Sequence, residues 1–225
     1  FDTIAGSGKN GAIIHYRAKK ENCKILEKKD IFLCDSGGQY KYGTTDVTRT
    51  LCFSKPKQNI KNFFTKVLKG HIAVATTNIN KDNVGKKIDK RARKFLNKSN
   101  LDYAHGTGHG VGFFLNVHEG PQSISKFSNI KIKEGMILSN EPGFYKKGQF
   151  GIRIENLVYV KKLNKKLIFK NLTMVPIEKD LINFKLLNLQ EKDYLFKYHL
   201  DIYVKISKFL NINERKWLAS FIQHF

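Results

Sequence analysis

The sequence predicts an α+β fold, because two strand-rich stretches enclose a pair of amphipathic helices and a helical tail follows. Residues 11–53 and 111–177 are rich in β-branched and aromatic residues punctuated by Gly or Lys turns, which is typical of strands. The 225 residues, 41% of them hydrophobic, suffice for one sizeable core. With no Pro- or Ser-rich linker in view, we expect one domain over residues 1–180 and a helical extension over 181–225.

The first strand-rich stretch contains three expected strands: G-A-I-I-H-Y at 11–16, I-F-L-C-D-S at 31–36 and V-T-R-T-L-C-F at 47–53. A Gly-rich turn lies between the second and the third. These two strands are therefore predicted to form a hairpin that brings Asp35 and Asp46 to the same end.

Two helices are expected next. The first is predicted to begin at Ser54, with Pro56 in its opening turn. Its apolar face would contain Ile60, Phe63, Phe64, Val67 and Leu68. The second is expected from about Val84 to Leu96, with Lys and Arg on its other face. His71 lies in a Lys-rich helix and is expected to be solvated.

The second strand-rich stretch repeats the pattern of acids beside a turn. Glu141 follows the apolar run M-I-L, Glu155 lies within F-G-I-R-I-E-N, and a Gly-containing turn lies between them. We therefore expect a second hairpin that presents two more carboxylates.

The tail is predicted to be helical. Asn188 and Glu191 have the spacing of a capping box, and apolar residues recur at helical spacing up to Phe209. A short helix from about Asn213 is expected to follow, and His199 is expected to pack within the apolar stripe.

Composition and motifs exclude several classes of function. The 41 Lys and Arg against 19 Asp and Glu give a net charge of +22, but the lysines are spread beside abundant Asn, so we expect no nucleic-acid partner. The run G-S-G-K-N at 6–10 lacks the Ser or Thr of a phosphate loop, and the glycines of 105–112 have the wrong spacing for a dinucleotide site.

The sequence also bears on the compartment. It has no apolar run of 18 residues and no leader after Phe1, so we expect a fragment or processed product with no membrane span. Cys23, Cys34 and Cys52 lack metal spacing, which favours reduced thiols and a cytoplasmic protein.

Acidic residues are scarce, so four carboxylates at the ends of apolar strands are notable. Ionised together in one pocket, Asp35, Asp46, Glu141 and Glu155 would repel one another, and a bound cation would remove that penalty. With His109 they form an oxygen-rich set that suits hard divalent ions such as Mn²⁺. Five ligands fit two ions about 3.5–4 Å apart better than one. The alternative is that these acids are surface charges paired with lysines.

Four segments carry a family resemblance: D-S-G-G-Q-Y-K-Y-G-T-T-D-V-T-R-T at 35–50, H-G-T-G-H-G-V-G-F-F-L-N-V-H-E-G-P at 105–121, N-E-P-G-F-Y at 140–145 and F-G-I-R-I-E-N at 150–156. They resemble Xaa-Pro aminopeptidase, of the pita-bread metallopeptidase family, over nearly the whole chain. The resemblance implies a curved antiparallel sheet covered by helices, with a C-terminal helical tail.

The resemblance also implies roles for the residues. Asp35 would hold one Mn²⁺, His109 and Glu141 the other, and Asp46 and Glu155 would bridge them, with Zn²⁺ or Co²⁺ as alternative ions. Glu141 would also help to deprotonate the attacking water between the ions. The matching substrate-site histidines are His15, His105 and His118, and Arg153 matches an arginine that steadies the acidic cluster. We also expect Asp35 to anchor the free amine of the substrate.

The implied activity is release of the N-terminal residue from peptides with proline in second position. Two alternatives remain: a prolidase-type dipeptidase acting on X-Pro, and a non-catalytic pita-bread binding module. The resemblance further implies a homodimer formed through the C-terminal helices. Asn140 stands where the family commonly has an acidic residue, and Phe144 stands where it commonly has Tyr. Neither change removes a ligand, so we expect them to alter the rate or the fit of the substrate.

Overall fold

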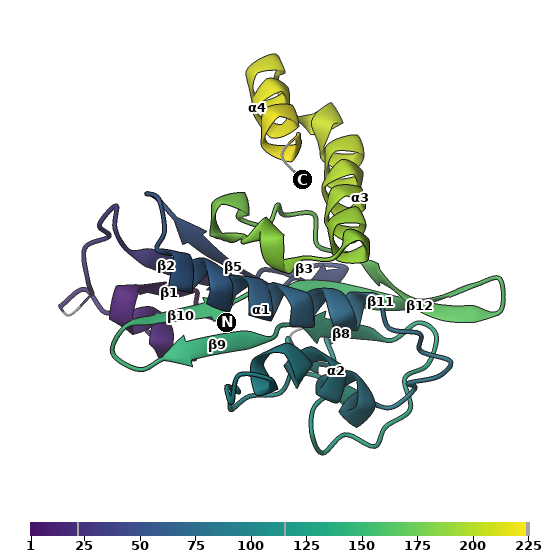
Figure 1. Ribbon diagram of the computed structural model, residues 1–225. Coiled ribbons are helices and arrows are strands. Elements are labelled where there is room, and N and C mark those ends of the chain that lie inside the picture. Colours follow the sequence, from purple (N-terminus) through teal and green to yellow (C-terminus); the bar gives the residue numbers. More distant parts are fainter. Residues whose placement is uncertain (22, 115, 224–225) are drawn as a thin grey trace.

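The computed structural model describes residues 1–21, 23–114 and 116–223, and it contains helices and antiparallel sheets as predicted (Figure 1). The α-helices are α1 (Gln58–Ala75), α2 (Gly85–Asn97), α3 (Leu189–Ile206) and α4 (Ile212–Ile222). The strands are β1 (Ile4–Ser7), β2 (Ile31–Ser36), β3 (Gln39–Tyr40), β4 (Gly43–Thr44), β5 (Val47–Cys52), β6 (Gly108–His109), β7 (Ser123–Ile124), β8 (Ile137–Asn140), β9 (Gly143–Lys146), β10 (Phe150–Arg153), β11 (Asn156–Leu163) and β12 (Lys166–Asn171). Among the described helices, none combines the length and the apolar character needed to cross a membrane.

The first sheet has the order β1-β2-β5 and is antiparallel throughout. Asp35 is opposite Thr48 in the β2–β5 pairing, and the small β3–β4 hairpin extends from the turn between the two strands. The predicted hairpin is therefore confirmed, with Asp35 near the end of β2 and Asp46 directly before β5.

The strand predicted at 11–16 is wrong. A 3₁₀ helix, Gly8–Ala12, and a turn occupy this segment, while the strand lies earlier, at Ile4–Ser7. Gly11 is pressed against other backbone, since a Cβ there would meet Gly6 O at 3.1 Å and Gly151 N at 3.2 Å. This close tertiary packing overrides the strand preference of the β-branched residues that follow.

Two further antiparallel groups hold the second strand-rich stretch. The strands β9 and β10 form a hairpin in which Arg153 is opposite Gly143, and β12-β11-β8 form a sheet in which Asn156 is opposite Asn140. Glu141 follows β8 and Glu155 precedes β11, so this register places the two acids beside one another. The prediction that a turn between them presents both carboxylates together is confirmed.

Helix α1 lies across the sheets and packs on α2 (Figure 1). A Cβ at Gly70 of α1 would lie 2.6 Å from Ala92 O of α2, so the glycine allows this approach. The predicted start of α1 at Ser54 is wrong, because the cap is Lys57 and Pro56 lies before it. Pro56 disfavours helical backbone at the residue before it, and the cap residue Lys57 still has an extended backbone.

The expectation that His71 is solvated is also wrong. This side chain is fully buried on the inner side of α1, and the pKa of His71 is lowered to about 3 by burial. Its Nδ1 lies 3.1 Å from Asn140 O, and Asn140 Nδ2 donates to His71 O at 3.0 Å. Asn140, which replaces the usual acidic residue of the family, is thus paired with a neutral histidine, His71.

Both predicted C-terminal helices are present, and the second begins with a capping box that the sequence analysis did not identify. Capping boxes at Asn188–Glu191 and Asn211–Glu214 begin α3 and α4, and buried Leu195, Tyr198 and His199 join α3 to the core. The two helices form an arm that stands out from the sheets (Figure 1).

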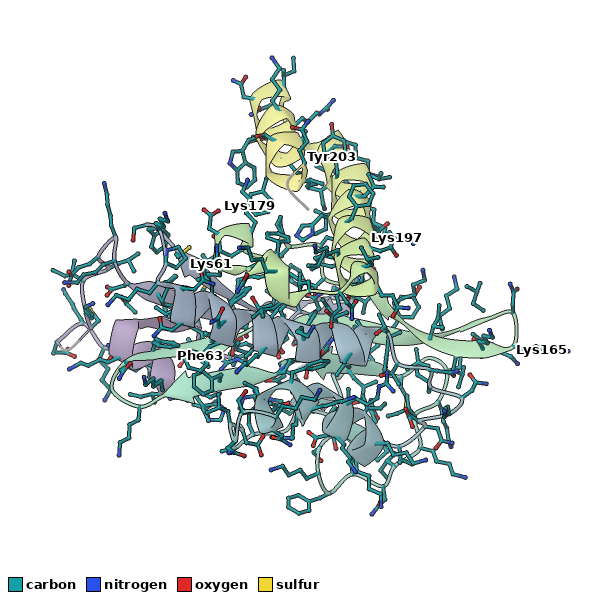
Figure 2. The ribbon with its side chains drawn as sticks, in the orientation of Figure 1. Lys61, Phe63, Lys165, Lys179, Lys197 and Tyr203 are labelled. Atoms are coloured by element: carbon teal, nitrogen blue, oxygen red, sulfur yellow. The ribbon has the colours of Figure 1, made fainter. Side chains whose placement is uncertain are left out.

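The lysines are spread over the surface. Figure 2 shows Lys165 at the outer end of the β11–β12 hairpin and Lys197 on the outward side of α3. Lysines also gather along α2, where Lys87, Lys90, Lys94 and Lys98 lie together with Arg91.

Candidate metal centre and active site

The five predicted ligands come from five separate places in the fold and line one cavity of about 430 Å³. The residues that the structure places there are Asp35 on β2, Asp46 before β5, His109 on β6, Glu141 after β8 and Glu155 between β10 and β11. Their arrangement follows from the two hairpin registers, which bring acids distant in sequence to the same region.

The ligand atoms are close enough to share a cation. One atom each from Asp46, His109 and Glu155 lies within 4.8 Å of the other two. His109 Nε2 is 3.4 Å from Asp46 Oδ2 and 3.3 Å from Glu141 Oε1. His109 Nδ1 lies 2.9 Å from Gly110 O, which can only accept, so the Nδ1 atom carries a proton and Nε2 is the ring atom that a cation in the cavity would bind.

The electrostatics of the cavity fit a cation. Burial raises the pKa of Glu141 to about 7, and burial followed by repulsion from Glu141 raises the pKa of Glu155 well above its ordinary value. Burial also raises the pKa of Asp35, although Arg153 opposes this effect. Burial alone would lower the pKa of His109, but Asp46 and then Glu141 outweigh it, and the pKa is raised.

One atom points directly to a ligand that the protein itself does not supply. Asp35 Oδ1 is buried, and no donor among the described residues reaches it. A buried carboxylate oxygen without a partner is costly, and a divalent cation would satisfy it. The donor set of carboxylates and one imidazole suits such an ion.

Two hydroxyl groups orient the glutamates, and the sequence analysis missed both. Thr48 Oγ1 donates to Glu155 Oε2 at 2.6 Å, and Ser139 Oγ donates to Glu141 Oε1 at 2.9 Å. Each hydroxyl lies two residues from a ligand that adjoins its strand, Thr48 from Asp46 directly before β5 and Ser139 from Glu141 directly after β8. That same-face spacing is the signal that would have revealed them.

Arg153 lies behind the acids, as its same-face spacing to Glu155 predicted. Its Nη2 donates to Asp35 Oδ2 at 2.6 Å, its Nε donates to Thr48 Oγ1 at 3.1 Å, and its Nη1 donates to the Tyr145 hydroxyl at 2.7 Å. Tyr145 was not predicted to take part. It links Arg153 to His105, because its hydroxyl lies 2.8 Å from His105 Nε2.

The three predicted substrate-site histidines all line the cavity. His118 packs edge-on against His109, with ring centroids 4.2 Å apart, and burial lowers its pKa. His105 is neutral, because burial lowers its pKa to about 4, and both ring nitrogens have partners, Gly106 O and Tyr145. His15 follows the 3₁₀ helix and has an exposed side chain.

The cavity also has an apolar wall that was not predicted. It is lined there by Phe1, Ile4, Ile14 and Val117. Arg17 and Asp2 lie at the same cavity.

Comparison with known proteins identifies the family. The sequence model of metallopeptidase family M24 matches residues 1–162, and that of the C-terminal region of peptidase M24 matches residues 165–225. The chain belongs to metallopeptidase family M24. Its predicted pita-bread fold and its likeness to Xaa-Pro aminopeptidase are thereby confirmed.

Curated relatives in this family are named probable Xaa-Pro aminopeptidase P. The protein from Laccaria bicolor is 48% identical over 97% of this chain, and the protein from Sclerotinia sclerotiorum is 46% identical over 99%. The chain spans 36% and 39% of the lengths of these two relatives.

Solved M24 structures share the fold. An X-prolyl aminopeptidase from Caenorhabditis elegans, described as a cytosolic enzyme with a di-nuclear active site, superimposes with a TM-score of 0.91 at 37% identity. That comparison covers 98% of this chain and 38% of the other. Prolidase from Pyrococcus furiosus gives a TM-score of 0.68 at 30% identity, covering 77% of this chain and 49% of the other.

Proposed function

We propose that this chain forms the catalytic part of an Xaa-Pro aminopeptidase, which releases the N-terminal residue from peptides with proline in second position. The observation that carries the proposal is the convergence of four carboxylates and one imidazole on a single cavity. The names of the relatives at 46–48% identity support the same activity.

The residues fit a pair of divalent cations, for which we propose Mn²⁺, with Zn²⁺ or Co²⁺ as substitutes. Asp35 would hold one ion, His109 and Glu141 the other, and Asp46 and Glu155 would lie between them. When bound, such ions lower the pKa of water and polarise a peptide carbonyl. The unpartnered Asp35 Oδ1 and the raised pKa values of the buried carboxylates support this assignment.

The chain's own groups account for the proton transfers. Glu141, a carboxylate that lines the cavity beside His109, would act as the general base that takes a proton from the attacking water. His118 stands at the cavity wall against His109, where its imidazole would stabilise the negative charge that develops on the substrate carbonyl. Asp35 would anchor the free amine of the substrate.

Cleavage before proline requires a pocket for the ring. The X-Pro bond has no N–H and its ring fixes the local backbone, so recognition depends on the shape of the pocket rather than on an amide hydrogen bond. We assign the ring to the apolar wall formed by Ile4, Ile14 and Val117, beside His15 and His105.

The C-terminal arm supplies a surface for a second copy of the chain. Phe196, Leu200 and Val204 recur every four residues along α3 and are 46%, 43% and 64% exposed, and Trp217 of α4 is 63% exposed. Such a stripe is apolar enough to pair with itself across a twofold axis. We therefore propose a homodimer through α3 and α4, and we place the protein in the cytoplasm, as described for the C. elegans enzyme.

A metal analysis combined with a peptide assay tests the proposal. The purified protein should take up two divalent ions and release the first residue of X-Pro-Pro peptides. Asp46→Asn and Glu155→Gln should abolish both properties, whereas Asp193→Asn, an exposed acid on α3 paired with Lys197, should not. Absence of ion uptake and of product would favour the binding module, and cleavage of X-Pro with poor cleavage of X-Pro-Pro would favour prolidase.

A further inference from the structure

Arg49, on β5, is a buried cation next to the acidic cavity that does not pair with any carboxylate among the described residues. Arg153 differs from it, because Arg153 donates directly to Asp35. Removing a guanidinium from water without a counter-ion is unfavourable unless each of its N–H groups finds an acceptor. The acceptors of Arg49 therefore show what the residue holds in place.

Half of these acceptors belong to Glu155 or to residues beside the candidate metal site. Arg49 Nη1 donates to Thr48 O at 2.8 Å and to Glu155 O at 2.6 Å, and Nη2 donates to Asn156 Oδ1 at 2.8 Å. The amide of Glu155 donates to Thr48 O at 3.1 Å. Both peptide groups that flank the Glu155 side chain are thus fixed, and Thr48 Oγ1 fixes the carboxylate itself.

The other half belong to the C-terminal region. Arg49 Nε donates to Pro176 O at 2.9 Å, and Nη2 donates to Val175 O at 2.6 Å and approaches the Tyr198 hydroxyl at 3.0 Å. The Tyr198 hydroxyl in turn donates to Val175 O at 2.7 Å. The next residue of α3, His199, accepts the amide of Ile177 at 3.1 Å, so two consecutive residues of the helix hold Val175 and Ile177 of the segment.

We infer that Arg49 is a positioning residue for Glu155 and that the C-terminal region, through residues 175–177 and Tyr198, is a structural part of the metal centre. The inference rests on the proposed metal function and deepens it. A planar guanidinium with five N–H donors is needed, because the acceptors come from β5, residues 155–156, residues 175–176 and α3. A lysine offers a point charge and cannot replace this geometry.

The test compares two hydroxyl deletions on the same helix. Tyr198→Phe removes the contact to Arg49, whereas Tyr203→Phe removes a hydroxyl for which no hydrogen bond is found among the described residues; Figure 2 labels Tyr203 toward the outer end of α3. Arg49→Lys removes the fork. The purified protein is stripped of metal, titrated with Co²⁺ by calorimetry, and examined by visible absorption, which reports the ligand geometry.

We expect Arg49→Lys to weaken Co²⁺ binding by about 10- to 100-fold and Tyr198→Phe by about threefold or more, as for other residues that orient a ligand. Both should change the Co²⁺ spectrum, and Tyr203→Phe should change neither property. If Arg49→Lys fails to fold, Tyr198→Phe decides the question. This variant loses only the hydroxyl oxygen that Arg49 contacts, so it is expected to disturb the fold less.

Two negative results are distinguishable. If the unmutated protein takes up no Co²⁺, the proposed metal centre and this inference fall together. If the unmutated protein binds two ions and Tyr198→Phe binds them with the same affinity and spectrum while its metal-free melting temperature drops, the contact serves stability alone and this inference is overturned.

Discussion

Ser139 Oγ donates a hydrogen bond to Glu141 Oε1 at 2.9 Å, and the same Ser139 Oγ atom accepts a hydrogen bond from the backbone amide of His109 at 2.9 Å. The Ser139 hydroxyl therefore uses its oxygen to hold the backbone of His109 and its proton to hold the side chain of Glu141. One buried hydroxyl thereby sets the relative position of two predicted ligands of the same ion.

Replacement of Ser139 by Ala should weaken metal binding by about tenfold. It should also lower the free energy of unfolding by about 1–3 kcal/mol, because the buried amide of His109 loses its acceptor. Ser128→Ala is the matched control, since Ser128 is also buried and its hydroxyl has no partner among the described residues. Equal metal titrations for the two variants would contradict the assignment.

Removal of the metal should destabilise the protein more at pH 8 than at pH 6. Burial raises the pKa of Glu141 to about 7 in the metal-free protein, so the folded state binds more protons than the unfolded state. This contribution, about 3 kcal/mol at most, is present below the ordinary pKa of Glu and is lost as the pH rises through 7. A bound cation stabilises the ionised carboxylates instead.

The measurement is the melting temperature of metal-loaded and chelator-treated protein at pH 6, 7 and 8. The difference between the two should widen with pH. A difference that narrows as the pH rises would show that the carboxylates remain ionised without a cation.

His199→Gln should reduce the acid sensitivity of the fold. His199 is neutral, with Nδ1 donating to Leu195 O at 2.8 Å and Nε2 accepting the amide of Ile177, and burial lowers its pKa to about 4. Its stabilising contribution is therefore complete above pH 6.5 and is lost as the pH falls toward 4, by about 3 kcal/mol.

Denaturant unfolding between pH 7 and pH 4 measures this effect. The free energy of unfolding of the variant should fall less between pH 7 and pH 4 than that of the unmutated protein, although it should be smaller at pH 7. His71 is also buried and neutral, but it is present in both proteins, so its contribution cancels. Parallel pH curves would mean that His199 does not titrate in this range.

Tyr145→Phe should lower kcat by about tenfold with a smaller change in KM. The substitution removes an acceptor from Arg153 and a donor from His105, and so loosens both the acidic cluster and the substrate-site histidine. Tyr159→Phe on β11 removes a hydroxyl that has no hydrogen bond among the described residues and should leave kcat unchanged. A variant Tyr145→Phe with full kcat would show that the two neighbours hold their positions without it.

The sequence predicted the structure correctly where the local pattern of residues agrees with the strand pairing or the cap that forms in the fold. Alternating apolar residues and glycine turns predicted which acids lie at hairpin ends, and Asn188 with Glu191 predicted a cap that both side chains form. The roles of the individual site residues stay predictions until the variants are measured.

The failures have a common physical origin in tertiary packing. The lysines around His71 suggested an exposed helix, yet that face of α1 covers the strand that ends at Asn140. Ile13 and Ile14 have strand propensity, but the contact between Gly11 and Gly151 fixes a 3₁₀ helix before them. Arg49 was overlooked because its acceptors are mainly backbone carbonyl groups, some of them 126 and 127 residues away.

The distribution of the Arg49 acceptors along the chain has a consequence for biosynthesis. Residues 35 to 155 contain all five candidate ligands, but three of the oxygen atoms around Arg49 come from Val175, Pro176 and Tyr198. A nascent chain on the ribosome therefore exposes its ligands well before the guanidinium can be enclosed. We therefore expect a chain cut before Val175 to bind the proposed ions more weakly than the chain described here.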